Sequence, residues 1–154
     1  MRLTRYSDYA LRTALYLAAQ TDRLSAIADV AAAYDVPENN LRKVVNDLVR
    51  AGFFESVRGR SGGVRLARDP SEIRVGEMLR VTEGHQAMVD CTGCFLAPTC
   101  GLIPGLADAR EAFFAALDGK TLADLVDERV RCLPALAQKR RAAQAMALTA
   151  EDAD

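Results

Sequence analysis

The segment 53–68, with the sequence FFESVRGRSGGVRLAR, places the tightest limit on the fold of this chain. Two short runs of β-forming residues flank the glycine-rich sequence RGRSGG, and glycine permits the positive φ angles that a hairpin turn requires. We therefore expect strands over 53–57 and 64–67, joined by a tight turn. Basic side chains lie along this hairpin: Arg58, Arg60, Arg65 and Arg68.

Three amphipathic segments precede the hairpin. Their apolar residues recur at spacings of three and four, which is typical of helices with one buried face. We expect a first helix over about 8–20 capped by Ser7, a second helix capped by Ser25, and a third over about 38–50 that ends at Gly52 in a left-handed conformation. The second and third helices fit a helix-turn-helix, and the hairpin that follows is then its wing.

The third helix and the wing carry residue types that bind DNA. Polar side chains on a helix reach phosphates and base edges, and arginines at a glycine-rich tip enter minor grooves. Predicted DNA contacts therefore come from the N-terminus, the third helix and the wing: Arg2, Asn39, Asn40, Arg42, Lys43, Asn46, Arg58, Arg60, Ser61 and Arg65.

The charge of the chain is distributed unevenly along its length. Residues 1–68 hold eleven Lys and Arg against seven Asp and Glu, whereas residues 69–154 hold nine against fourteen. A basic first half indicates a polyanion partner, such as double-stranded DNA, at one end of the molecule. A charged solvent-facing surface, or a small α+β domain with a basic hairpin and no DNA contact, is the alternative interpretation.

The rest of the chain is expected to be mainly helical. We expect a short helix over 75–82, a long amphipathic helix over 102–117 and a short helix capped by Thr121. The apolar stripe of the long helix is too long to be buried against one winged domain, so a second copy is expected to cover it in a two-fold dimer. The predicted fold class is thus mostly α with a small β-hairpin, in which a winged helix-turn-helix domain is followed by a long dimerisation helix.

This pattern divides the chain into four stretches. We assign 1–83 to the DNA-binding domain, 84–101 to a cysteine loop, 102–130 to the dimerisation helix and a short helix, and 131–154 to a tail whose end is expected to be disordered. No apolar run is long enough to span a membrane, and the N-terminus lacks the apolar stretch of a signal peptide. We therefore expect a cytoplasmic protein with no membrane partner.

Three cysteines lie close together in the sequence DCTGCFLAPTC, with the spacing Cys91-x2-Cys94-x5-Cys100. Clustered cysteines in a cytoplasmic protein more often bind metal or act in redox chemistry than form disulfides. The spacing leaves three interpretations open. They are an iron–sulfur cluster, a zinc site with Cys132 or His85 as the fourth ligand, and a Cys-x-x-Cys thiol–disulfide switch.

Several segments together resemble the Rrf-type winged-helix regulators. They are MRLTRYSDYALRTALYLA, LRKVVNDLVRAGFFESVRGRSGGVRLAR, IRVGEMLRVTEG, the cysteine loop and TLADLV, and the resemblance covers roughly residues 1–128. Within that family the cysteine loop followed by TLADLV is most similar to the nitric-oxide-sensing repressors. The resemblance implies a homodimer with one iron–sulfur cluster per subunit, which releases its DNA operator when nitric oxide attacks the cluster.

The resemblance also implies a set of cluster ligands. Cys91, Cys94 and Cys100 would bind a four-iron cluster, and Asp8 of the partner subunit would complete it. Carboxylate oxygen is a harder and more labile ligand for iron than thiolate, so one iron would remain open to nitric oxide. Asp8 also fits a simpler role, as an acid that interacts with the positive end of a helix.

Two departures from the family pattern concern the cluster type. Only two residues separate Cys91 from Cys94, fewer than in the relatives, although ferredoxin-type Cys-x2-Cys runs still bind a four-iron cluster. Cys100 is not followed by the histidine of the iron–sulfur-assembly regulators, which argues against a two-iron cluster of their type. We expect a four-iron cluster, with a two-iron cluster as the alternative.

Other functions remain open on the sequence. The same fold could carry an iron-sensing or redox-sensing regulator, or a zinc-stabilised DNA-binding protein. A Cys-x-x-Cys oxidoreductase is disfavoured because no βαβ pattern surrounds the motif, so we expect the chain not to be an enzyme.

Overall fold

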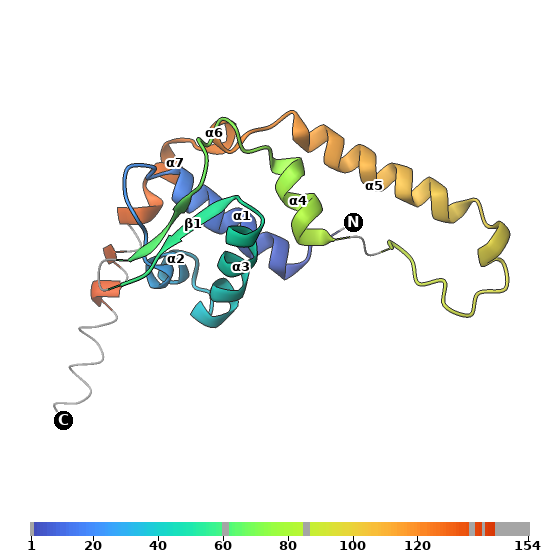
Figure 1. The fold of residues 1–154 in the computed structure, drawn as a ribbon, viewed down its shortest axis with the longest axis horizontal. Coiled ribbons are helices and arrows are strands. Elements are labelled where there is room, and N and C mark those ends of the chain that lie inside the picture. Colours follow the sequence, from blue (N-terminus) through green and yellow to red (C-terminus); the bar gives the residue numbers. More distant parts are fainter. Residues whose placement is uncertain (1, 60–61, 85–86, 136–137, 140, 144–154) are drawn as a thin grey trace, which may run out of the picture.

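The computed structural model describes residues 2–59, 62–84, 87–135, 138–139 and 141–143. The elements, in chain order, are α1 (Arg5–Ala18), α2 (Ile27–Tyr34), α3 (Glu38–Arg50), β1 (Phe54–Val57), β2 (Gly63–Leu66), α4 (Val75–Glu83), a short 3-10 turn (Ala97–Thr99), α5 (Leu102–Asp118), α6 (Leu122–Leu125) and α7 (Glu128–Arg131) (Figure 1). The predicted class, mostly helical with one small hairpin, is confirmed.

Helix α1 begins earlier than predicted, and Ser7 is not its cap. The N-cap is Thr4, whose hydroxyl accepts a hydrogen bond from the Ser7 N–H at 3.1 Å. Ser7 is buried, and its own hydroxyl donates to the Thr82 hydroxyl of α4 at 2.8 Å. Both residues are good capping types, so the contact with α4, which the local sequence does not reveal, decides between them.

Helix α2 also begins without the predicted cap. Its N-cap is Ala26, whose side chain makes no capping bond, and Ser25 lies outside the helix. The backbone of Ser25 instead pairs with Val64, with N–H···O bonds of 2.9 Å in both directions. Ser25 therefore fastens the start of the helix-turn-helix to the wing.

Helix α3 and the hairpin match their predictions to within one residue. Four apolar side chains of α3 face the core: Leu41, Val44, Val45 and Leu48. Gly52 has φ 78°, as predicted for the residue that ends the helix. The two strands are antiparallel, with Phe54 opposite Leu66.

The core lies around α1, which packs against α3, α4 and α6. Its largest fully buried side chains include Tyr16, Phe53, Ile73, Met78 and Leu122. Burial of such side chains stabilises a fold by about 1.5–3 kcal/mol each. Leu122 belongs to α6, so this short helix completes the core of the winged domain, whereas the sequence grouped it with the long helix.

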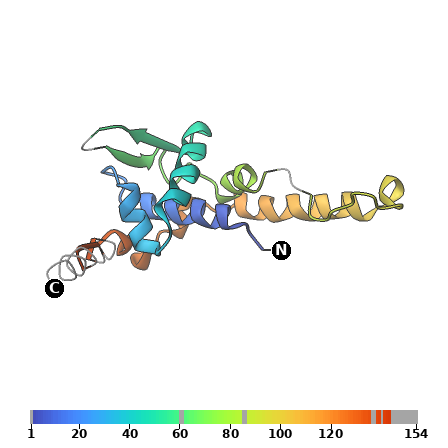
Figure 2. The same ribbon diagram turned by 90° about the horizontal axis from the view of Figure 1, so that it is seen from below.

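The second half of the chain follows the predicted helices closely. Residues 87–101 run outward beside α5, and α5 begins at the far end of this projection and leads back to the winged domain (Figures 1 and 2). The Thr121 cap is confirmed, because Thr121 and Asp124 form a reciprocal capping box. No helix within the described ranges is long and apolar enough to cross a membrane. The expected disorder at the end of the tail concerns residues 144–154, which lie outside the described residues.

Candidate cluster loop and nucleic-acid interface

The three clustered cysteines lie on the connection between α4 and α5. Cys94 is exposed, Cys91 and Cys100 are partly exposed, and all are free thiols. The loop turns tightly here, because the Cys94 N–H donates to the Cys91 carbonyl at 3.1 Å and the Ala97 N–H donates to the Cys94 carbonyl at 3.2 Å. The loop therefore brings three soft ligands to the outer end of α5.

The chemistry of this donor set fits an iron–sulfur cluster. Thiolates are the usual ligands of such clusters, and loops with closely spaced cysteines wrap around them. Within the described residues no group of three His, Cys, Asp or Glu side chains converges closely enough to hold a metal ion. In the described part of the chain the three thiols therefore do not form a closed set of metal ligands.

Asp8 lies in the first turn of α1 and is partly exposed. Its carboxylate accepts a hydrogen bond from Arg12 Nε at 2.8 Å, and 42% of the Asp8 side chain remains exposed. Ion pairs of this exposure contribute little to stability, so the carboxylate can exchange Arg12 for another cation. The helix cap itself is Thr4.

The remaining candidate ligands lie elsewhere. Cys132 is an exposed thiol directly after α7, which packs against α1. It is thus not part of the loop beside α5. His85 lies outside the described residues.

Apolar side chains are exposed at the outer end of α5 and on the loop. Phe114 is the one residue of α5 that is buried in the described structure. Phe95 of the loop is 94% exposed and Leu102 of α5 is 57% exposed. A hollow of about 640 Å³ lies between residues 87–92 and α5. Exposed apolar surface of this kind often marks an interaction site.

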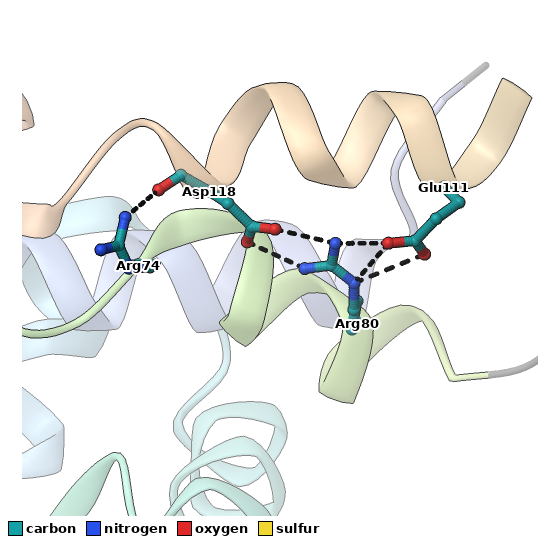
Figure 3. Close-up of polar contacts among 4 residues, drawn as sticks. All are labelled: Arg74, Arg80, Glu111 and Asp118. Atoms are coloured by element: carbon teal, nitrogen blue, oxygen red, sulfur yellow. Dashed lines mark hydrogen bonds and ion pairs between the residues drawn. The ribbon is translucent and has the colours of Figure 1, made fainter.

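An ion-pair clamp fixes the inner half of α5 to α4 (Figure 3). Arg80 of α4 donates to both carboxylate oxygens of Asp118 at 2.8 Å and to Glu111 Oε1 at 2.6 Å. Arg74 donates to the Asp118 carbonyl at 2.7 Å. The hydrogen bonds raise the pKa of Arg80 and hold the pKa values of Asp118 and Glu111 below their ordinary range.

Helices α4 and α5 also approach each other closely at Gly76. A Cβ at this position would lie 2.8 Å from the Asp118 amide nitrogen, and it would also overlap the Phe114 carbonyl oxygen. The Phe114 ring is buried beside this contact, and the guanidinium groups of Arg80 and Arg110 lie 5.5 and 5.1 Å from its centre. The inner half of α5 is therefore held by packing as well as by charge.

Two further contacts tie the start of the cysteine loop to its surroundings. Arg110 of α5 donates to the carbonyl of Gly84, where the loop begins. Glu83 accepts hydrogen bonds from the Thr4 N–H at 2.8 Å and from the Thr4 hydroxyl at 2.9 Å. Burial raises the pKa of Glu83, but the hydrogen bonds that its carboxylate accepts at the start of α1 outweigh this effect and leave the pKa below its ordinary value. The loop is thus connected to α5 and to the helix that carries Asp8.

The sequence did not reveal this clamp. Arg80 is separated from Glu111 by 31 residues and from Asp118 by 38 residues, and nothing in the local pattern pairs them. The seven-residue interval between the two acids, which puts both on one face of a helix, was the available signal.

The predicted DNA contacts that the structure describes are all exposed: Arg2, Asn39, Asn40, Arg42, Lys43, Asn46, Arg58 and Arg65. The hairpin and α3 lie on the same side of the domain (Figure 2). Arg42 is paired with Glu38 at 2.5 Å and Arg65 with Glu55 at 2.9 Å. Arg60 and Ser61, at the tip of the wing, lie outside the described residues.

Known proteins similar to this chain agree with the predicted regulator. The family model described as "Rrf2: Iron-dependent Transcriptional regulator" matches residues 3–128. The chain is 41% identical over 146 residues to the HTH-type transcriptional regulator NsrR of Geobacillus kaustophilus (strain HTA426), which covers 91% of this chain and 99% of the relative. It is 40% identical over 145 residues to NsrR of Bacillus subtilis (strain 168), which covers 90% and 99%.

Solved structures give the same result. CymR (YrzC), the global cysteine regulator of B. subtilis, superposes with a TM-score of 0.64 at 28% identity and covers 81% of this chain and 95% of its own. IscR of T. potens superposes with a TM-score of 0.61 at 26% identity and covers 81% and 85%. The named relatives are regulators, as expected for a chain that is not an enzyme.

Proposed function

This chain belongs to the Rrf2 family of transcriptional regulators, and from that premise we propose that it is a cytoplasmic, DNA-binding repressor that senses nitric oxide through an iron–sulfur cluster. The observation that carries the proposal is a loop with three free cysteines joined through α4 and α5 to a winged helix-turn-helix. Two relatives at 40–41% identity are named NsrR. NsrR is the name of the nitric-oxide-sensing repressors that the sequence resembles, so this match favours nitric oxide as the signal.

The proposed cluster site uses three thiolates and one carboxylate. Cys91, Cys94 and Cys100 hold a four-iron cluster, and Asp8 of the partner subunit completes it. When bound, the cluster supplies an iron atom that reacts with nitric oxide. The exposed Asp8–Arg12 ion pair supports the assignment, because little free energy opposes its exchange.

The proposed dimer forms through the outer half of α5. This half exposes Leu102 and Ile103, and Phe95 is exposed beside it on the loop. A second copy would remove these apolar side chains from water, which is favourable by about 25 cal/mol per Å² of apolar surface. A homodimer with two winged DNA-binding domains also matches operators that are built from two half-sites.

The path from the cluster loop to the DNA-binding elements runs through named contacts. Arg110 holds the start of the loop to α5, and Glu83 holds the end of α4 to the N-cap of α1. The Arg80 clamp makes α4 and the inner half of α5 move together. A rearrangement of the loop would therefore change how the two winged domains are held, which couples the two sites.

The decisive experiment is anaerobic purification followed by an absorbance spectrum and iron and sulfide analysis. We expect a coloured protein with iron and sulfide near four per chain. A colourless protein loaded with zinc would contradict the proposal and would favour a zinc-stabilised DNA-binding protein instead.

A second candidate function is an iron-sensing or redox-sensing regulator of the same fold. The description of the matching family as iron-dependent favours it. The two functions predict different experimental results. A nitric oxide sensor should release DNA on addition of stoichiometric nitric oxide, whereas an iron or redox sensor should respond to an iron chelator or to oxygen.

A further inference from the structure

A polar hollow lies between the first turns of α1 and α3. It encloses about 280 Å³ and is lined by Arg5, Tyr6, Tyr9, Asn39, Asn40, Lys43 and Val44. Two cationic side chains, two side-chain amides and two phenols thus border one depression. The sequence had suggested Arg2 at this end of the chain, whereas Arg5 is the residue that borders the hollow.

The two cations of the hollow are available to a ligand. Across the described ranges neither Arg5 nor Lys43 makes an ion pair with a carboxylate. Arg42, one position before Lys43, differs because Glu38 already neutralises it. Positive charge without a partner at the border of a hollow favours an anion there.

Asp47, an acid on α3 that contacts the lining residue Tyr6, is already occupied. Asp47 Oδ2 accepts a hydrogen bond from the Tyr6 hydroxyl at 2.8 Å, and Asp47 Oδ1 lies 3.5 Å from Arg50 Nη1. Burial, with the hydrogen bond to Asp47, raises the pKa of Tyr6, so the phenol stays protonated and donates. Arg50 thus offsets the negative charge of Asp47, which would otherwise repel an anion.

We propose that this hollow binds one backbone phosphate of DNA, with Arg5 and Lys43 supplying the charge. The inference rests on the proposed function, because it assumes that α3 enters the major groove. In helix-turn-helix proteins the first residues of the recognition helix contact base edges. A phosphate held between α1 and α3 would fix the depth and register of α3, and phosphate contacts generally serve this positioning role.

The test measures DNA affinity against salt for Arg5→Ala, Lys43→Ala and the double variant. Lys120→Ala is the matched control, because it removes the same charge from the exposed connection between α5 and α6. The probes are a duplex that the wild-type protein selects from a random-sequence pool and a duplex of scrambled sequence with the same composition. Circular dichroism confirms that each variant is folded.

If Arg5 and Lys43 contact the same phosphate, three results are expected for DNA affinity and its salt dependence. Arg5→Ala should weaken binding to both duplexes by the same factor and should reduce the salt slope by about 0.9 for each phosphate that the protein no longer neutralises. The double variant should be weakened by less than the sum of the two single effects, because both cations act on one group. A single neutral methylphosphonate at the contacted position should weaken the wild type and should leave the double variant unaffected.

Other results would overturn the inference. A weakening confined to the selected duplex would make Arg5 a base contact, and a response equal to that of Lys120→Ala would show that the hollow binds no phosphate. If the wild type binds neither duplex, the proposed function fails together with this inference. If the wild type binds and Arg5→Ala is unaffected, only the inference fails.

Discussion

Helices α4 and α5 contact each other closely at Gly76. We therefore predict that Gly76→Ala weakens the packing of α5, the helix beside the cysteine loop, against α4. The new Cβ would lie 2.8 Å from the Asp118 amide nitrogen and would also overlap the Phe114 carbonyl and the Asp118 carboxylate. Backbone atoms of a helix cannot swing aside as a side chain can. Helix α5 must therefore shift away from α4, and the Arg80 clamp must stretch with it.

The size of the effect follows from two opposing terms. Overpacking a close contact costs up to about 3 kcal/mol, whereas alanine in place of Gly76, the second residue of α4, gains at most about 1 kcal/mol. We therefore expect a net decrease of about 2 kcal/mol in the free energy of unfolding. The cluster should still assemble on its three cysteines, but its state should affect DNA affinity less than in the wild type.

Urea denaturation of the apoprotein measures the change in stability, and titration of DNA before and after nitric oxide measures the coupling. Gly119→Ala is the control, because a Cβ there would meet only the Ala116 carbonyl oxygen, at 3.6 Å. Its stability should stay within about 0.5 kcal/mol of the wild type, as for most substitutions away from special features. If Gly76→Ala proves as stable and as responsive as Gly119→Ala, the reasoning is refuted.

The other predictions concern the cluster ligands and the contact between α1 and α4. Cys94→Ala should abolish stable iron binding, whereas Cys132→Ala should keep it; loss of the chromophore in Cys132→Ala would show that the ligands were misassigned. Asp8→Ala should retain the cluster but lower DNA affinity, and unchanged affinity and nitric oxide reactivity would remove Asp8 from the ligand set. The lowered pKa of Glu83 means that its bonds to Thr4 stabilise the fold above the ordinary glutamate range and are lost as pH falls through the lowered value. Glu83→Gln should therefore reduce this acid sensitivity in thermal melts, and an identical pH profile would contradict the assignment.

The elements that the sequence predicted well are those with strong local signals. The apolar spacing in α3 and the Thr121 cap of α6 act over a few residues, so the pattern itself determines them. The hairpin is similar, because the glycines between its strands permit the positive φ angles that a tight turn requires. Gly59, for example, has φ 118°, which other residues rarely adopt.

The elements that the sequence missed depend on long-range contacts. Thr4 and Ser7 are both capping types, with Ser the more favoured in isolation, and the bond from Ser7 to Thr82 of α4 accounts for the cap being Thr4. Ser25 does not cap α2. Its backbone instead pairs with Val64 of the wing, 39 positions further along the chain. The Arg80 clamp and the hollow beside Arg5 likewise join segments whose proximity only the fold creates.

The most direct test of the central claim measures DNA binding and cluster state in the same anaerobic sample. Small additions of nitric oxide are made to the cluster-loaded protein with a fluorescently labelled duplex, selected from a random pool by that protein, and anisotropy and absorbance are followed together. We expect the duplex to dissociate as the cluster absorbance disappears. Full retention of the duplex after the cluster has reacted completely would contradict the claim that the cluster controls DNA binding.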